Sequence, residues 1–212
     1  MTEYSPLQSE IKKLIKSSGP MPVWRYMELC LTHPNYGYYI SRDPLGREGD
    51  FTTSPEVSQM FGELLGLWVG SVWKAIGSPS LLRLIELGPG RGTMMADALR
   101  ALRVLPPLYQ ALSIHLVEIN PVLREKQKAA LSGVRIIAWH DSLDQVPTGP
   151  AVILANEYFD VLPIHQAVKR ETGWHERTVE IDDGGRLAFG FAPDPMPRFE
   201  VLLPPLVRAA PV

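Results

Sequence analysis

Residues 81–102 read LLRLIELGPGRGTMMADALRAL, and this stretch carries the clearest structural signal in the chain. Its first part, residues 81–87, is a short apolar run, which is typical of a buried strand. The glycine-rich segment 88–92 follows at once, and from Thr93 onward apolar residues recur at helical spacing. A strand, a loop and a helix in this order place a helix N-terminus at the carboxyl end of a strand, where open α/β sheets bind their ligands. The stretch therefore predicts a ligand-binding loop in an α/β fold.

The alternation of strands and helices continues after this stretch. Apolar runs at 114–118, 134–139 and 151–155 predict three further strands, and the pattern of residues 121–131 predicts a second helix. Because the strand runs are continuous and mostly apolar, we expect both faces of the sheet to be covered. The pattern predicts βαβ units with a mostly parallel sheet, and we assign residues 81–212 to this core.

The end of the chain has a different pattern. Strands at 165–169 and 174–181 flank a turn at 171–173, which predicts a hairpin, and residues 187–191 form a possible additional strand. The segment after Pro193 is rich in proline and has no strong period.

Residues 1–80 are expected to form a helical extension. Helices are predicted from Pro6 to about residue 18, from about Pro22 to residue 31, and from Ser54 to about Gly77, with a loop over 33–53. The third helix carries an apolar stripe at i, i+3, i+4 spacing, which predicts that this face packs into the core. The stripe consists of Val57, Met60, Phe61, Leu64, Leu65, Trp68, Val72, Trp73 and Ile76.

Composition excludes several functions. The 212 residues include 21 basic and 23 acidic side chains, so the basic excess expected of a nucleic-acid binder is missing. The single cysteine, Cys30, allows neither an internal disulfide nor a multi-cysteine metal site, and it favours a reducing compartment. The five histidines lack metal-ligand spacing, and we expect no metal site.

No targeting or membrane signal is visible in the sequence. The apolar runs are shorter than the ~20 residues that cross a bilayer, so we expect no membrane insertion. The first residues include Glu3 and Glu10 and contain no apolar signal region, which favours a cytoplasmic location.

The glycine spacing in the loop discriminates among nucleotide ligands. Gly88, Gly90 and Gly92 form G-x-G-x-G, whereas the dinucleotide fingerprint G-x-G-x-x-G requires glycine where this chain has Thr93. The next acid, Glu118, lies 30 residues past Gly88 rather than the ~20 of the dinucleotide pattern. A P-loop is excluded because no Gly-Lys-Ser/Thr follows.

Acidic residues at successive strand ends favour S-adenosylmethionine as the cofactor. Glu86 precedes the loop, and Glu118 ends the second strand, where its carboxylate would accept hydrogen bonds from two ribose hydroxyls. Asp141 or Ser142, after the third strand, would lie near the adenine. The plainer alternatives are a tight turn for the glycines and a helix cap for Asp141.

The fourth strand ends in Asn156-Glu157-Tyr158-Phe159-Asp160. Asn156, Glu157 and Asp160 could hold a polar or cationic methyl acceptor, and the alternative is a turn with capping side chains. A carboxylate can orient a guanidinium by paired hydrogen bonds and help to accept its proton, and we therefore expect Glu157 and Asp160 to take part in catalysis.

Four segments in the same order resemble motifs of one family. They are PNYGYY at 34–39, GDFTTSPEVSQMFG at 49–62, ELGPGRGTMM at 86–95 and ANEYFDVLP at 155–163. The chain resembles the MidA-like S-adenosylmethionine-dependent methyltransferases from about residue 8 to about residue 190. The resemblance implies a Rossmann-like class I methyltransferase fold with an N-terminal helical extension.

The resemblance also implies roles for particular residues. Gly88, Gly90 and Gly92 would contact the cofactor, Glu118 would bind its ribose, and Asn156, Glu157 and Asp160 would face the acceptor. The segment from Asp50 to Glu56, which includes Thr52 and Thr53, would close over the cofactor.

The resemblance implies that the methyl acceptor is an arginine of a protein, and we expect this protein to be a subunit of respiratory complex I. We expect the methyltransferase itself to lie in a bacterial cytoplasm. A complete fold of this class has seven strands, so we expect a C-terminally truncated core. The alternatives are a non-catalytic assembly factor that binds S-adenosylmethionine and a methyltransferase for small molecules.

Overall fold

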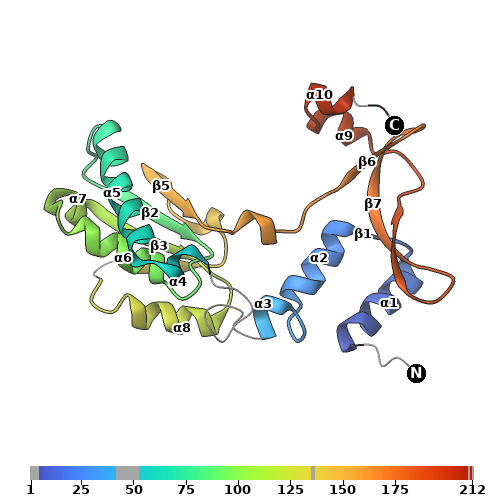
Figure 1. Cartoon of the computed structure of the whole chain (residues 1–212), viewed down its shortest axis with the longest axis horizontal. Coiled ribbons are helices and arrows are strands. Elements are labelled where there is room, and N and C mark those ends of the chain that lie inside the picture. The colour runs from blue at the N-terminus through green and yellow to red at the C-terminus, as the bar shows by residue number, and fades with distance from the viewer. Residues whose placement is uncertain (1–4, 42–52, 135–136, 210, 212) are drawn as a thin grey trace. The chain divides into compact units, whose positions relative to one another are not determined.

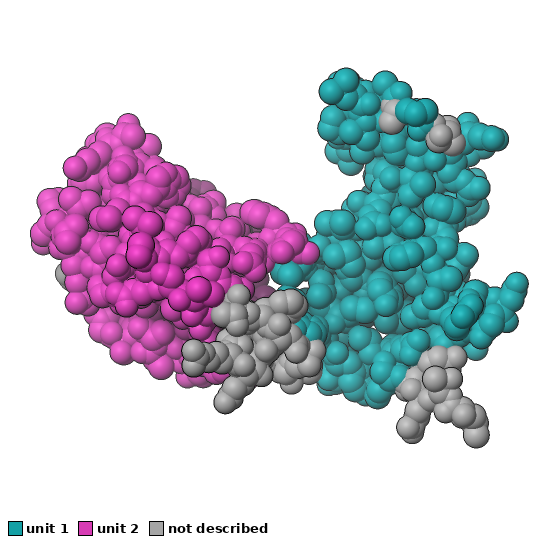
Figure 2. Space-filling view, in the orientation of Figure 1, with its two compact units in different colours: residues 1–41, 161–212 teal, residues 42–160 magenta. Residues whose placement is uncertain are grey.

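The computed structural model describes residues 5–41, 53–134, 137–209 and 211. The chain forms two compact units, which Figure 2 shows in different colours. Unit 1 comprises residues 1–41 and 161–212, and unit 2 comprises residues 42–160. These limits differ from the division expected near residue 80. The helices of 54–75 belong to the same unit as the parallel sheet, and the C-terminal hairpin belongs with the first helices.

Unit 2 is built on a parallel sheet. Its strands are β2 (Leu82–Leu87), β3 (Leu112–Val117), β4 (Ile137–His140) and β5 (Ala151–Ala155), in the order β4-β3-β2-β5 (Figure 1). All three strand pairs are parallel, and Leu87 of β2 lies opposite both Val117 and Ala155. The predicted α/β fold with a parallel sheet is confirmed, and the carboxyl ends of β2, β3 and β5 lie side by side.

Helices connect these strands and pack against the sheet. They are α4 (Ser54–Val57), α5 (Gln59–Ala75), α6 (Thr93–Leu102), α7 (Pro106–Ala111) and α8 (Pro121–Ala130), with short 3-10 turns η1 (Leu143–Gln145) and η2 (Phe159–Val161). Apolar side chains of β2 and β3 form the main core with those of α6, including Leu84, Ile114, Leu116, Met95 and Leu102. Burial of this apolar surface is the main force that holds the unit together.

The third predicted helix differs from its expectation in two ways. First, it is interrupted at Ser58, whose extended backbone (φ −147°, ψ 120°) separates α4 from α5. Second, the predicted apolar stripe is only half right. Phe61, Leu65, Val72 and Trp73 contact the core, but Val57, Met60, Leu64, Trp68 and Ile76 are exposed.

Glycines explain which face of α5 is buried. Gly62, Gly66 and Gly70 lie four residues apart along the helix and are buried, with Gly62 and Gly66 against α6. A Cβ atom at Gly66 would lie 2.5 Å from the carbonyl oxygen of Ala98. The two helix backbones are therefore too close for any side chain at this position, and the larger residues on the opposite face of α5 remain exposed.

Unit 1 combines helices with an antiparallel sheet. The helices are α1 (Pro6–Ser18), α2 (Val23–Thr32), α3 (Tyr38–Ser41), α9 (Pro197–Leu202) and α10 (Pro205–Arg208). The strands β1 (Met21–Pro22), β6 (Ala167–Arg170) and β8 (Leu187–Phe191) each pair with the central strand β7 (Gly173–Ile181). The first two predicted helices, the hairpin and the third strand of this region are confirmed.

The core of unit 1 joins segments from both ends of the chain. Ile11 and Ile15 of α1 pack with Val23 and Leu29 of α2 and with Val179 of β7. Lys12 adds a polar link, because its Nζ donates a hydrogen bond to the carbonyl oxygen of Gly185 at 2.5 Å. In the described part of the chain, every helix is too short or too polar to cross a membrane.

Candidate cofactor-binding site

The glycine loop between β2 and α6 has a backbone that favours glycine. Gly88, Gly90 and Gly92 have φ values of 61°, 56° and 84°, in the left-handed region that other residues rarely adopt. Gly88 also leaves room for Tyr158, because a Cβ atom there would lie 2.6 Å from Cδ2 of that ring. Gly92 is the N-cap of α6, so the loop ends at the positive end of the helix dipole.

Glu86 is a buried acid at the end of β2, two residues before the loop. Only 2% of its surface is exposed, and its Oε2 has no hydrogen-bond partner among the described residues. Burial without a compensating charge raises the pKa of this carboxyl to about 8. A buried carboxylate oxygen that lacks a donor is suited to a cationic group of a ligand, and the ammonium group of S-adenosylmethionine is such a group.

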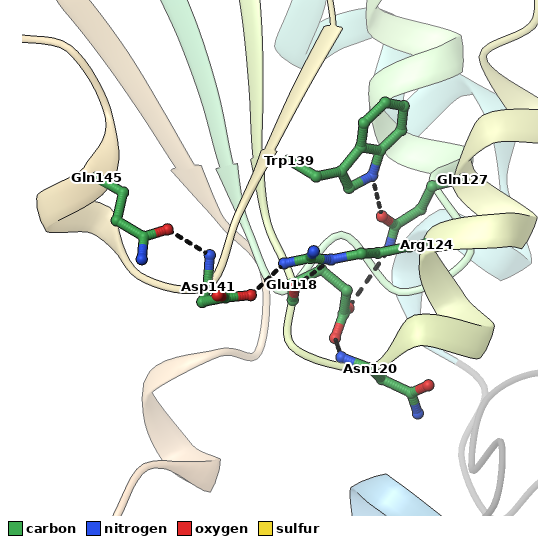
Figure 3. A network of polar contacts seen from close by, with 7 residues as sticks. All are labelled: Glu118, Asn120, Arg124, Gln127, Trp139, Asp141 and Gln145. Carbon is green, nitrogen blue, oxygen red and sulfur yellow. Dashed lines mark hydrogen bonds and ion pairs between the residues drawn. The ribbon is translucent and has the colours of Figure 1, made fainter.

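Glu118 follows β3 and is also buried. Its Oε1 accepts a hydrogen bond from the main-chain N–H of Asn120 at 2.8 Å, and its Oε2 accepts one from Nε2 of Gln127 at 3.3 Å (Figure 3). Burial raises the pKa of Glu118, while these hydrogen bonds act in the opposite direction. The main chain of Ile119 also donates to this carboxylate. A carboxylate has about four acceptor positions, so Glu118 can still accept a hydrogen bond from a ligand hydroxyl.

Gln127 of α8 connects Glu118 to the glycine loop. Its side chain is fully buried, and its Nε2 donates to the carbonyl oxygen of Gly90 at 2.7 Å. Its Oε1 accepts a hydrogen bond from Nε1 of Trp139 in β4 at 2.8 Å. The sequence pattern alone did not predict a role for Gln127. One signal could have identified Gln127. It is a polar residue on the buried side of a helix, and this helix adjoins the ends of two strands that carry candidate ligand-binding acids.

Asp141 lies after β4 and takes part in an ion pair. Its Oδ1 lies 2.6 Å from Nη2 of Arg124, whose Nε donates to the carbonyl oxygen of Glu118 at 2.7 Å (Figure 3). The alternative interpretation as a helix cap is wrong for Asp141, because Ser142 occupies the N-cap position of η1. Arg124, another residue that sequence reasoning missed, thus links the ends of β3 and β4.

The segment predicted to cover the cofactor is described only in part. Asp50 and Thr52 lie outside the described residues. Thr53 precedes α4, and its carbonyl oxygen accepts a hydrogen bond from the N–H of Glu56 at 2.9 Å. The Glu56 carboxylate in turn accepts a hydrogen bond from Oγ1 of Thr93 at 2.7 Å. This part of the segment is therefore held at the N-terminus of α6, beside the glycine loop.

The predicted acceptor-binding residues follow β5. Asn156 is half-buried, and Glu157 and Asp160 are exposed. Glu157 has a φ of 50°, which is uncommon for a residue other than glycine and costs conformational energy. Such strain is often concentrated at functional sites. Because β5 pairs with β2, this segment begins beside the end of the strand that leads into the glycine loop.

The chain matches a model of one known protein family. The family model described as an S-adenosyl-L-methionine-dependent methyltransferase matches residues 64–210. The chain belongs to this family. Membership confirms the MidA-like resemblance, the Rossmann-like methyltransferase fold and S-adenosylmethionine as the cofactor of the family.

Curated relatives of the chain are protein arginine methyltransferases. The mitochondrial protein arginine methyltransferase NDUFAF7 of Homo sapiens is 40% identical over 218 residues, covering 91% of this chain and 49% of the human protein. Its counterpart in Xenopus tropicalis is 42% identical over 205 residues, covering 85% of this chain and 48% of the frog protein. The chain thus spans about half the length of these curated relatives.

A solved structure with a bound ligand is similar to the chain. It is the crystal structure of a Burkholderia thailandensis protein bound to S-adenosyl-homocysteine, with a TM-score of 0.75 and 30% sequence identity. The similarity covers 95% of this chain and 55% of that protein. Within the described part of our chain, no cluster of three or more His, Cys, Asp or Glu side chains could hold a metal ion.

Proposed function

We propose that this protein binds S-adenosylmethionine at the loop of Gly88, Gly90 and Gly92 and transfers its methyl group to an arginine of a protein acceptor. The observation that carries the proposal is the position of two buried carboxylates, Glu86 and Glu118, at the ends of adjacent strands around a left-handed glycine loop. The cofactor, when bound, supplies an electrophilic methyl group.

The two buried acids suit different parts of the cofactor. The unpartnered oxygen of Glu86 would receive the ammonium group, and this ion pair would compensate the charge that burial now disfavours. Glu118, already oriented by Asn120 and Gln127, would accept the ribose hydroxyls. Asp141, which is held by Arg124, and the neighbouring Ser142 would lie on the adenine side.

The segment 156–160 would bind the acceptor. A guanidinium remains protonated because its pKa is far above neutral pH, so it must be oriented and must lose a proton during methylation. Glu157 and Asp160 supply exposed carboxylates that can form paired hydrogen bonds with it and accept that proton. The names of the curated relatives support arginine as the acceptor, and we infer that a respiratory complex I subunit carries it.

Calorimetric titration with S-adenosylmethionine tests the cofactor site. We expect the wild-type chain to bind and Gly90→Val to lose binding. Gly77→Val is the matched control, because Gly77 also has a positive φ (88°) but lies at the end of α5, away from the loop. A folded wild-type chain that binds no S-adenosylmethionine would overturn the proposal.

Labelled methyl transfer tests the acceptor. Arginine-containing proteins of respiratory complex I are offered with the labelled cofactor, and the modified residue is identified by mass spectrometry. We expect methylarginine, and its loss in Glu157→Ala with Asp160→Ala. Cofactor binding without transfer would instead indicate an assembly factor, and methylation of small amines alone would indicate a small-molecule enzyme.

A further inference from the structure

The Gln127 side chain donates hydrogen bonds both to the glycine loop, at the Gly90 carbonyl oxygen, and to the Glu118 carboxylate. Figure 3 shows the contact with Glu118. We infer that Gln127 is a positioning residue, which holds the Gly90 carbonyl and the Glu118 carboxylate in the arrangement that binds the cofactor ribose. The inference rests on the proposed function, because it concerns the same cofactor site.

Trp139 determines the orientation of the Gln127 amide. An indole N–H can only donate a hydrogen bond, so the atom of Gln127 that faces Trp139 must be the carbonyl oxygen. The amide nitrogen is then directed to two acceptors, the Gly90 carbonyl oxygen and Oε2 of Glu118. Because Gln127 is fully buried, no water can replace a lost partner without rearrangement, and each unmade bond carries a desolvation cost.

The contact with Gly90 constrains the glycine loop. In a trans peptide the carbonyl and the following N–H lie in one plane and point in opposite directions. Because Nε2 of Gln127 holds the Gly90 carbonyl at 2.7 Å, it also sets the direction of the N–H of Arg91. Glycine has many accessible backbone conformations, so an external hydrogen bond of this kind selects one of them.

The contact with Glu118 acts on the ribose acceptor. A donor to Oε2 favours the ionised carboxylate, which is the form that accepts hydrogen bonds from ribose hydroxyls. Arg124 is the charged group near Glu118 on α8, and Asp141 lies on the far side of Arg124 after β4. Gln127 is therefore a neutral donor that favours the ionised form of Glu118, against the effect of burial, and fixes the rotation of its carboxylate.

The test compares S-adenosyl-homocysteine with its 2′-deoxy analogue by calorimetry between about pH 5 and about pH 9. The variants are Gln127→Met, which removes the amide, Gln127→Glu, which replaces the donor by an acceptor, and Trp139→Phe, which removes the indole N–H together with part of the ring. The matched control is Gln110→Met on the exposed side of α7. Circular dichroism establishes that each variant is folded.

We expect Gln127→Met to weaken binding of S-adenosyl-homocysteine about 10-fold to 100-fold, as for loss of a hydrogen bond to a charged group. Its affinity for the 2′-deoxy analogue should fall less, so discrimination between the two ligands decreases. The pH at which binding is half lost on acidification should rise, because Glu118 is more easily protonated. Trp139→Phe should show the same changes at smaller size, and Gln110→Met should behave as wild type.

The outcomes separate the inference from the proposed function. Equal loss for both ligands with an unchanged pH midpoint would show a purely structural role for Gln127 and overturn the inference. Unchanged binding in the folded Gln127→Met and Gln127→Glu variants would also overturn it, while the cofactor site would stand. If the folded wild-type chain itself binds neither ligand, the proposed function and the inference both fail.

Discussion

Thr93 donates a 2.7 Å hydrogen bond from its Oγ1 to Oε1 of Glu56, which joins the first residue of α6 to the short helix α4. Thr93 stands where a dinucleotide-binding loop would have its third glycine, and here its hydroxyl makes a contact that glycine could not make. The residue at this position therefore argues against a dinucleotide ligand, and it anchors Glu56, the last residue of the segment predicted to cover the cofactor.

This contact predicts energetic coupling between the two residues. Thr93→Val removes the hydrogen-bond donor, and Glu56→Gln weakens the acceptor. In urea unfolding, the change in unfolding free energy of the double variant should differ from the sum of the two single changes by about 0.5–1.5 kcal/mol. The affinity for S-adenosyl-homocysteine should fall in Thr93→Val. If the effects of the two single changes on unfolding simply add, the hydrogen bond makes no net contribution to stability.

The raised pKa of Glu86 predicts that stability depends on pH. In the folded state the Glu86 carboxyl keeps its proton up to about pH 8, whereas in the unfolded chain it loses the proton near pH 4.5. The folded protein therefore binds more protons between these values, and the free energy of unfolding should fall as pH rises, by up to about 1.4 kcal/mol per pH unit. Glu86→Gln should remove this slope and be more stable than wild type near pH 8.

Urea unfolding of wild type and Glu86→Gln across that range measures the difference. Glu118→Gln serves as a comparison, because hydrogen bonds to Glu118 oppose the effect of its burial. Parallel curves for wild type and Glu86→Gln would mean that Glu86 has an ordinary pKa. Saturating S-adenosylmethionine should reduce the slope in wild type, because its ammonium group would favour the ionised carboxylate.

The close contact between α5 and α6 predicts that substitutions on the two faces of α5 change stability by different amounts. Gly66→Ala would place a methyl group 2.5 Å from the Ala98 carbonyl oxygen, so unfolding should become easier by about 1–3 kcal/mol, the usual cost of overpacking. Leu64→Ala on the opposite face should change stability by less than about 0.5 kcal/mol, since 58% of Leu64 is exposed. Thermal unfolding of both variants tests the prediction, and the reverse ranking would contradict the close packing of the glycine face.

The positive φ of Glu157 predicts a separation of stability from activity. Glu157→Gly relieves a strained backbone and should leave the protein as stable as wild type or up to about 1 kcal/mol more stable. Glu157→Val should destabilise it, because a β-branched residue tolerates φ of 50° poorly. Methyl transfer should fall in both variants if the carboxylate orients the acceptor. Full transfer by Glu157→Gly would rule out that role.

Much of the fold follows from local sequence pattern. The predicted strands at 81–87, 114–118 and 151–155 agree with β2, β3 and β5 to within two residues at each end, because a buried parallel strand needs a mostly apolar segment. The glycine loop and the acids at 86 and 118 were recognisable for a similar reason. The sharp turn between β2 and α6 uses left-handed backbone, which favours glycine, and the two acids lie at or directly after the ends of strands.

Tertiary structure decided the features that depend on distant partners. The periodicity of α5 identified an amphipathic helix, but only the close approach of α6 determined that the glycine face is buried and that Trp68 remains half exposed. Gln127 is an ordinary helix residue in the sequence. Its role arises because folding places Gly90, Glu118 and Trp139, from three different segments, within hydrogen-bond distance of one buried amide. Local pattern reports backbone propensity and average burial, whereas specific polar contacts arise only when the strands and helices are assembled.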